Sequence, residues 1–386
     1  MNRVPPVNLA QQYQNLRDQV RAAVEAVLAS GQYIGGEVVE QFEQQFSQFL
    51  GVSEAIGCNS GTDALFLALR ALGIGPGDEV ITTPFTFIAT AEMISAVGAT
   101  PVFVDIEPDT YNIDVEQIEA AITPRTRAII PVHLFGHPVN MTRLMAIAEA
   151  HHLAVIEDCA QAAGAKWQGQ TVGCIGHIGC FSFFPTKTLG ACGDGGAVTT
   201  NDENLATKIR QFKNHGQSGR YCSDTVGINS RLDALQAAIL SIKLQYLDHW
   251  NHQRQTLAAR YDQFLSHIPG IIVPQAHAHA TSVWNLYTLQ VEHQPRLTPS
   301  PRDQLQTQLQ HHGISTTVYY PIPLHLQPIY KNLNYYPGQF PVAEQIAQTV
   351  LSLPIYPELS LMQQDQVIDQ FKDSWQSLKF SQQKSL

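Results

Sequence analysis

The sequence lacks any long apolar run, and this excludes several classes of protein. No stretch of about 18 apolar residues occurs, so we expect no membrane span. The first residues, MNRVPPVNLAQQYQ, lack the apolar core of a signal peptide. Cations are also scarce: 23 Lys and Arg stand against 33 Asp and Glu, giving a net charge of −10. This balance argues against nucleic acid as a main partner.

The short motifs of disulfide, metal and nucleotide-binding proteins are missing as well. The six cysteines show no CxxC spacing and fall mostly in apolar or Gly-rich segments. Reduced thiols in a cytoplasmic protein are therefore expected rather than a disulfide framework. Neither a Walker pattern nor GxGxxG occurs in the right context. Too few His, Cys and Asp residues cluster at any point to predict a metal site.

The first half of the chain alternates short β-rich runs with helical patterns. Between about residues 55 and 200 the runs are DEVITTPF, TPVFVDI, RAIIPVHLF, LAVIED, CFSFF and GAVTT. Residues 63–72 and 142–151 carry apolar side chains at helical spacing. This alternation predicts a mainly parallel sheet covered by helices on both faces. Ligands of such folds gather at the carboxyl ends of the strands.

The second half of the chain has a different pattern. A long helical pattern runs from 231 to about 267. SVWNLYTLQV and ISTTVYYPIP are typical of strands, and 302–312 of a helix. We therefore predict a large α/β domain with an N-terminal arm over 1–250, and a smaller α+β domain over 251–386.

Two predicted strands end in residue types that bind ligands or take part in catalysis. One strand runs into CNSGTDAL, where the helix start at Gly61 and Thr62 offers free N–H groups; it is either an ordinary helix cap or a phosphate site. Another ends on Glu157 and Asp158, with Gln161 three residues later. A buried carboxylate there is a structural ion-pair partner, a metal ligand, or the counter-ion of a protonated heterocycle.

Lys187 lies just after the CFSFF run, in a Pro/Gly-rich turn. A lone lysine on a turn is usually a surface residue. A lysine in an apolar cleft, by contrast, has a lowered pKa, and its neutral amine can form a Schiff base with a carbonyl. The residues before it, Phe183 to Pro185, do not fit a phosphate-binding loop.

Taken together, these strand ends compose a site for pyridoxal phosphate. Its phosphate is expected on Gly61, Thr62 and Ser182. Asp158 would hold the ring nitrogen protonated, and Lys187 would capture the aldehyde. Gln161 would reach the ring hydroxyl. Phe87, in TTPFTFIAT, either stacks on the ring or belongs to the core.

At these residues the sequence resembles the DegT-type family of pyridoxal-phosphate sugar aminotransferases. The resemblance extends from GQYIGGEVVEQFE and CNSGTDAL through IEDCAQAAGA, FSFFPTKTLGACGDGGA and GINSRLDALQAAIL to VYYPIPLHLQP and VLSLPIYPEL. It implies a fold of the aspartate-aminotransferase type (fold type I) and a homodimer with shared active sites. It also implies transfer of an amino group from L-glutamate to C3 of a nucleotide-linked keto-sugar. The nucleotide, dTDP or UDP, and the sugar stay open.

The resemblance also assigns residues outside the Lys187 cluster. Asn229 would reach the phosphate of the neighbouring subunit's site, and Arg231 would help to define the substrate pocket. Without the family, NSRLD is typical of a helix cap at Asn229 or Ser230. Tyr319 and Tyr320 stand where some relatives have His-Tyr, which leaves the sugar in doubt, and His325 either lines the same pocket or is a satisfied polar residue. A further set of alternatives is open: a pyridoxal-phosphate sugar dehydratase, or a non-catalytic regulatory homologue.

Overall fold

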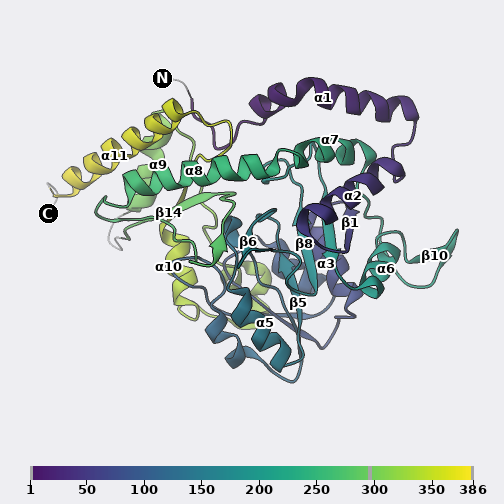
Figure 1. The fold of residues 1–386 in the computed structure, drawn as a ribbon. Helices are drawn as coiled ribbons and strands as arrows, with labels where there is room; N and C mark the ends of the chain where they lie inside the picture. Colours follow the sequence, from purple (N-terminus) through teal and green to yellow (C-terminus); the bar gives the residue numbers. More distant parts are fainter. Residues whose placement is uncertain (1–2, 294–297, 384–386) are drawn as a thin grey trace.

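The central feature of the fold is a seven-stranded sheet with helices on both faces (Figure 1). The computed structural model describes residues 3–293 and 298–383. Along the sheet the order is β1-β9-β8-β5-β4-β2-β3, and the neighbouring pairs from β8 to β3 are parallel. Only β9 runs against its neighbours. The strands are β1 (Glu54–Cys58), β2 (Glu79–Thr82), β3 (Thr100–Phe103), β4 (Thr126–Ile129), β5 (Ala154–Asp158), β8 (Ile178–Ser182) and β9 (Gly196–Thr200).

Alternate side chains of these strands enter two separate cores, which makes the arrangement three-layered. Val80, Ile156 and Val198 pack against one helical layer, formed by α3 (Gly61–Ala71), α4 (Ala89–Ala96) and α6 (Glu203–Phe212). Ile81, Val155 and Phe181 face the other layer, formed by α2 (Glu37–Leu50), α5 (Met141–Ala150) and α7 (Ala234–Leu244). Burial of both faces explains why the strands are nearly continuous apolar runs. The predicted mainly parallel three-layer domain is confirmed.

A second, smaller sheet forms a separate core. Its order is β12-β14-β15, with all pairs antiparallel. The sheet consists of β12 (Ile271–Ile272), β14 (Tyr287–Val291) and β15 (Val350–Leu353), and it packs against α8 (Leu247–Leu265), α9 (Pro301–His311) and α11 (Leu361–Gln383). The remaining elements are α1 (Leu9–Ser30), α10 (Pro341–Thr349), β6 (Lys166–Trp167), β7 (Gln170–Thr171), β10 (Gln217–Gly219), β11 (Cys222–Ser223) and β13 (Ala280–Thr281).

Three sequence-based expectations differ from the structure in the second half. The helix expected over 231–267 is two helices, because the chain breaks between α7 and α8 at Gln245 and Tyr246. Only the second half of SVWNLYTLQV is a strand. ISTTVYYPIP forms isolated bridges at Ile314 and Thr317 instead of a strand. Prolines lack the N–H that a strand needs, and this segment turns to line a pocket. The boundary predicted at 250 falls inside α8, and the two-domain division stays a prediction.

The helices of residues 3–293 and 298–383 include none that combines the length and the apolarity required to cross a bilayer. The cysteines are free thiols: Cys58, Cys159, Cys174 and Cys180 are buried, whereas Cys192 and Cys222 are exposed.

Candidate active site

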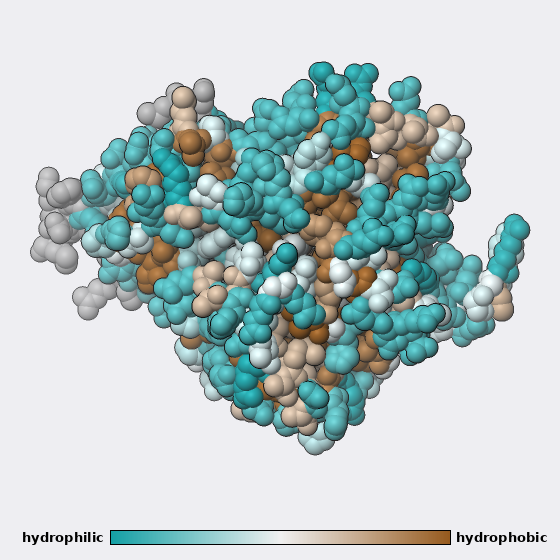
Figure 2. Space-filling view, viewed as in Figure 1, coloured by the Kyte–Doolittle hydropathy of each residue, from teal (hydrophilic) through white to brown (hydrophobic). Residues whose placement is uncertain are grey.

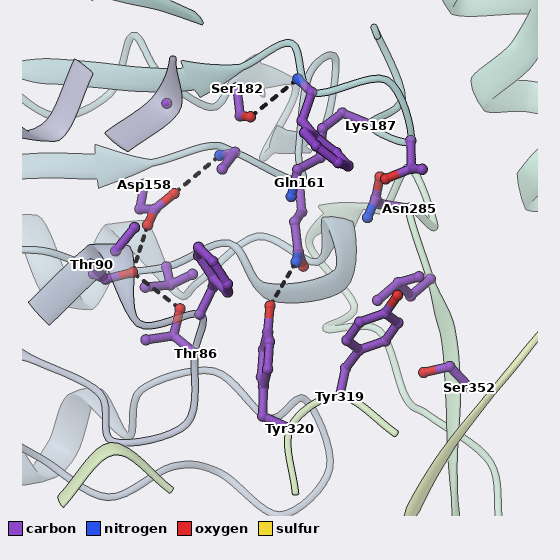
Figure 3. Close-up of a pocket in the computed structure, with 18 of the residues that line it drawn as sticks. Thr86, Thr90, Asp158, Gln161, Ser182, Lys187, Asn285, Tyr319, Tyr320 and Ser352 are labelled. Atoms are coloured by element: carbon purple, nitrogen blue, oxygen red, sulfur yellow. Dashed lines mark hydrogen bonds between the residues drawn. The ribbon is translucent and has the colours of Figure 1, made fainter. Parts of the chain in front are cut away.

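Four parallel strands end at one edge of the large sheet, and their ends surround a cavity of about 600 Å³. The segments that follow β1, β2, β5 and β8 all contribute to its lining (Figure 3). The structure therefore brings together most of the residues singled out in the sequence. These are Gly61, Thr62, Phe87, Asp158, Gln161, Ser182, Lys187, Tyr319 and Tyr320.

The start of α3 forms one wall of the cavity. Ser60 caps the helix, because its hydroxyl accepts a hydrogen bond from the Asp63 N–H at 3.0 Å. The N–H groups of Gly61 and Thr62 are thus left for a ligand. A Cβ placed on Gly61 would lie 2.7 Å from the Cβ of Ser182, so only glycine allows β8 to end this close to the helix. The helix cap is therefore Ser60, and the phosphate role of Gly61 and Thr62 stays a prediction.

Asp158 is buried at the end of β5 and fixed by two donors. One carboxylate oxygen accepts from the Ala160 N–H at 3.1 Å, and the other from the Thr90 hydroxyl at 2.8 Å. Burial raises the pKa of Asp158, while these two hydrogen bonds and the charge of Lys187 oppose the rise. Thr90 was missed in the sequence, because a threonine on a helix carries no signal of its own. It joins the site only because the start of α4 lies next to the end of β5.

Gln161 is held in the loop after β5 by contacts at both ends of its amide. Its oxygen accepts from the Phe135 N–H at 2.6 Å, and its NH₂ donates to the Tyr320 hydroxyl at 3.2 Å (Figure 3). Phe87 lies 6.4 Å from the Tyr320 ring between centroids and is 56% exposed. Phe87 is therefore a pocket residue and does not belong to the core.

Lys187 lies in a tight turn after β8, where its N–H donates to the Phe184 carbonyl at 2.9 Å. The turn is close enough that a Cβ on Gly190 would lie 2.3 Å from the Pro185 oxygen. Loss of surrounding water lowers the pKa of Lys187 to about 8, although the Asp158 charge acts in the opposite direction. The neutral fraction of this amine near pH 7 is therefore far larger than for an ordinary lysine, and a nucleophile requires the neutral form.

Glu157, next to Asp158, points to the other side of the sheet and has a different environment. Its carboxylate accepts hydrogen bonds from Gly173, Ile175 and Gly176 N–H groups and from His133. Cys159 lies near enough to complete a His-Glu-Cys group. Because backbone donors already occupy both oxygens of Glu157, this group is explained by hydrogen bonding and points to no metal.

Three predicted site residues do not line this cavity. Asn229 is exposed in the segment before α7. Arg231 lines a different cavity, of about 360 Å³. His325 is buried, with Nε2 3.1 Å from a Glu344 oxygen, so the pocket role considered for it has no geometric support.

The helix cap expected at Asn229 or Ser230 is also wrong. The N-cap residue of α7 is Asp233. The Ser230 hydroxyl instead donates to Asp63 at 2.7 Å and accepts from the Asn59 N–H, which ties this segment to the start of α3.

Comparison with known proteins identifies the family to which the sequence is similar. The model of the DegT/DnrJ/EryC1/StrS aminotransferase family matches residues 14–372. Curated relatives include a dTDP-3-amino-3,4,6-trideoxy-alpha-D-glucose transaminase of Streptomyces venezuelae, 45% identical over 96% of both chains. A UDP-N-acetyl-3-dehydro-alpha-D-glucosamine 3-aminotransferase of Acidithiobacillus ferrooxidans is 47% identical, over 92% of this chain and 94% of that one. A protein of Geobacillus stearothermophilus named pleiotropic regulatory protein is 46% identical, over 96% and 98%.

Solved structures share the fold over nearly the whole chain. S. venezuelae DesV, in complex with a ketimine intermediate, superimposes with a TM-score of 0.93 at 45% identity, over 97% of this chain and 99% of that one. Bacillus subtilis NtdA, with bound cofactor PMP, gives a TM-score of 0.89 at 35% identity, over 97% and 86%. The predicted fold type I architecture is confirmed by these neighbours.

Proposed function

The chain belongs to the DegT/DnrJ/EryC1/StrS aminotransferase family, and from this premise we propose that it aminates C3 of a nucleotide-linked 3-keto-sugar. L-Glutamate is the amino donor, and pyridoxal phosphate is the cofactor. The product is a nucleotide-linked 3-amino sugar for glycan or polysaccharide biosynthesis. The observation that carries this proposal is the convergence of Lys187, Asp158, Gln161 and the start of α3 on one cavity.

The residues of the cavity fit the cofactor at each of its functional groups. The N–H groups of Gly61 and Thr62 and the Ser182 hydroxyl form a phosphate cradle, which a side chain at position 61 would fill. Asp158 would hold the ring nitrogen, Gln161 the ring oxygen, and Phe87 the ring face. Lys187 supplies the amine that captures the aldehyde.

Pyridoxal phosphate contributes an aldehyde that binds amines and a ring that accepts an electron pair. The protein does the rest. The Lys187 amine takes a proton from Cα of glutamate and later delivers one to C3 of the sugar, which its lowered pKa suits. Asp158 stays ionised beside a ring cation. The hydrogen bonds of Asp158 to Thr90 and Ala160 keep its carboxylate in one orientation.

We place the enzyme in the cytoplasm as a homodimer in which each protomer completes the other's site. Asn229 and Arg231 lie outside their own cavity, and a role in the partner's site accounts for them. Apolar side chains are exposed on α1 and just after it, at Leu28, Tyr33 and Ile34. Figure 2 shows apolar patches over the region of α1, α2 and α7, and the β10–β11 hairpin projects from the body.

Subunit complementation tests this dimer. Lys187→Ala and Asn229→Ala variants are each expected to be inactive. Mixed and refolded together, they form heterodimers with one intact site, so partial activity returns. If mixing the two variants restores no activity, Asn229 does not act in the partner's site and the shared site is contradicted.

The proposed reaction is tested with the purified enzyme, L-glutamate and a panel of dTDP- and UDP-linked 3-keto-sugars. Mass spectrometry is expected to find an aminated sugar and 2-oxoglutarate. Borohydride reduction of the holoenzyme should fix the cofactor on the peptide that contains Lys187. A deoxygenated product would instead identify a dehydratase, an alternative that Lys187 disfavours because the relatives that dehydrate use histidine there.

The regulatory alternative has support in the name of the G. stearothermophilus relative. The complete set of Asp158, Gln161, Ser182 and Lys187 in one cavity favours catalysis, because a purely regulatory protein has no need of it. Purified protein without cofactor absorbance, unchanged by added pyridoxal phosphate, would favour the regulatory role.

A further inference from the structure

Arg254 is a buried cation in the wall of the active-site cavity that the reaction above leaves without a role. It lies on α8, is 4% exposed, and lines the same cavity as Lys187. Its Nε and Nη1 atoms are buried and have no hydrogen-bond partner within the described residues 3–293 and 298–383. Buried charged donors are nearly always satisfied, so unpaired ones in a cavity wall indicate a missing anion.

Neighbours on α8 fix the position of Arg254. One turn earlier, Asn251 donates to the Ala163 carbonyl at 3.1 Å, in the loop that follows β5. The next residue, Gln255, donates to the Ser282 carbonyl at 2.9 Å, in the segment that leads to β14. Arg254 is therefore held between the loop after β5 and the segment before β14.

Asn285, on that segment, extends the same wall toward the reacting lysine. It is buried, its Oδ1 has no partner within the described residues, and it lies beside Lys187 in the close-up (Figure 3). Its amide carries two N–H donors besides the oxygen. Arg254 and Asn285 thus both present polar groups with no partner within the described residues to the cavity that contains Lys187.

The anion that fits this wall is a carboxylate. A guanidinium presents two parallel N–H groups that match the two oxygens of a carboxylate. Leu286, Leu353 and Ile355 add apolar side chains to the lining of the same cavity. We propose that Arg254 and Asn285 bind a carboxylate of the amino donor, an α-amino dicarboxylate such as L-glutamate. This inference rests on the proposed function.

The charge of Glu358 also acts on Arg254. The charge of Glu358 raises the pKa of Arg254, while burial lowers that pKa to about 10. If Arg254 only balanced the charge of Glu358, a lysine at this position would serve equally well, because lysine keeps the positive charge. Lysine lacks the planar fork, so it would not replace Arg254 as a carboxylate ligand.

The test compares Arg254→Lys with Arg260→Lys in the holoenzyme. Arg260 is on the same helix, but its guanidinium pairs with Asp365 away from the cavity. L-Glutamate is titrated without sugar while the cofactor absorbance is followed, and calorimetry measures binding of glutarate, which has no amine to react. For Arg254→Lys we expect the glutamate half-saturation to rise about 100-fold and glutarate binding to be lost. Arg260→Lys is expected to bind glutamate and glutarate as the wild type does. The KM for the keto-sugar is expected to stay unchanged in both variants.

Unchanged glutamate and glutarate affinities in Arg254→Lys would overturn the inference. So would a loss confined to sugars that carry a uronate carboxylate, because the sugar would then be the source of the anion. If Arg254→Lys does not fold, Asn285→Ala serves instead, with an expected rise in half-saturation of about 10-fold. A wild-type cofactor that never responds to glutamate refutes the proposed function, and glutarate calorimetry still decides the carboxylate site.

Discussion

Replacing Asp158 by asparagine removes one buried negative charge from the site and changes little else. Asparagine has nearly the same shape and keeps an oxygen that accepts from either Thr90 or Ala160. It loses the negative charge that, in the proposed function, stabilises the protonated ring nitrogen of the cofactor. Lys187 and the phosphate cradle are untouched, so the cofactor is expected to stay bound.

The size of the effect follows from the burial of the carboxylate. Asp158 is 5% exposed. Removing one partner of a buried ion pair typically costs about 3–5 kcal/mol. If that loss falls on the transition state, kcat declines by about 10²- to 10³-fold or somewhat more, since each decade corresponds to about 1.4 kcal/mol.

The assay measures kcat for amination together with the fraction of protein that retains cofactor after borohydride reduction. Asp194→Asn is the matched control, because Asp194 also lines the cavity but is exposed. We expect normal retention in both variants and a large loss of kcat only in Asp158→Asn. Turnover of Asp158→Asn within a few-fold of wild type would refute the assigned role.

The other predictions concern the cradle, the lysine and the sheet. Gly61→Ala places a Cβ 2.7 Å from that of Ser182, so cofactor affinity should decline at least about 10-fold in fluorescence titrations; an unchanged affinity contradicts the cradle. Because the pKa of Lys187 is lowered to about 8, its neutral fraction grows with pH up to that value. Cofactor uptake by the apoenzyme should therefore accelerate from pH 6 and level off above about pH 8, and a flat stopped-flow profile argues against it. Glu157→Gln should lower the free energy of unfolding by about 3–5 kcal/mol in urea, because the buried carboxylate accepts hydrogen bonds from His133 and three backbone N–H groups, whereas the exposed Glu119→Gln should have a much smaller effect; equal effects would contradict this structural role of Glu157.

The outcome in the second half of the chain shows where local patterns fail. The break between α7 and α8 at Gln245 and Tyr246 has no proline or glycine to mark it. ISTTVYYPIP has strand composition, but its prolines and its position over the cavity prevent regular pairing. Strand propensity depends on available neighbours, which a local window does not contain.

The sequence by itself determined the layered fold and the gathering of Asp158, Ser182 and Lys187 at one cavity. Apolar runs alternating with helical patterns required a covered parallel sheet, and the topology of such a sheet brings strand ends, with Asp158 and Ser182, to one edge. Tertiary structure alone decided which distant side chains joined them. Thr90 and Arg254 entered through helix packing, whereas His325 was directed elsewhere. Such contacts depend on how whole elements pack, and neither residue type nor spacing encodes that locally.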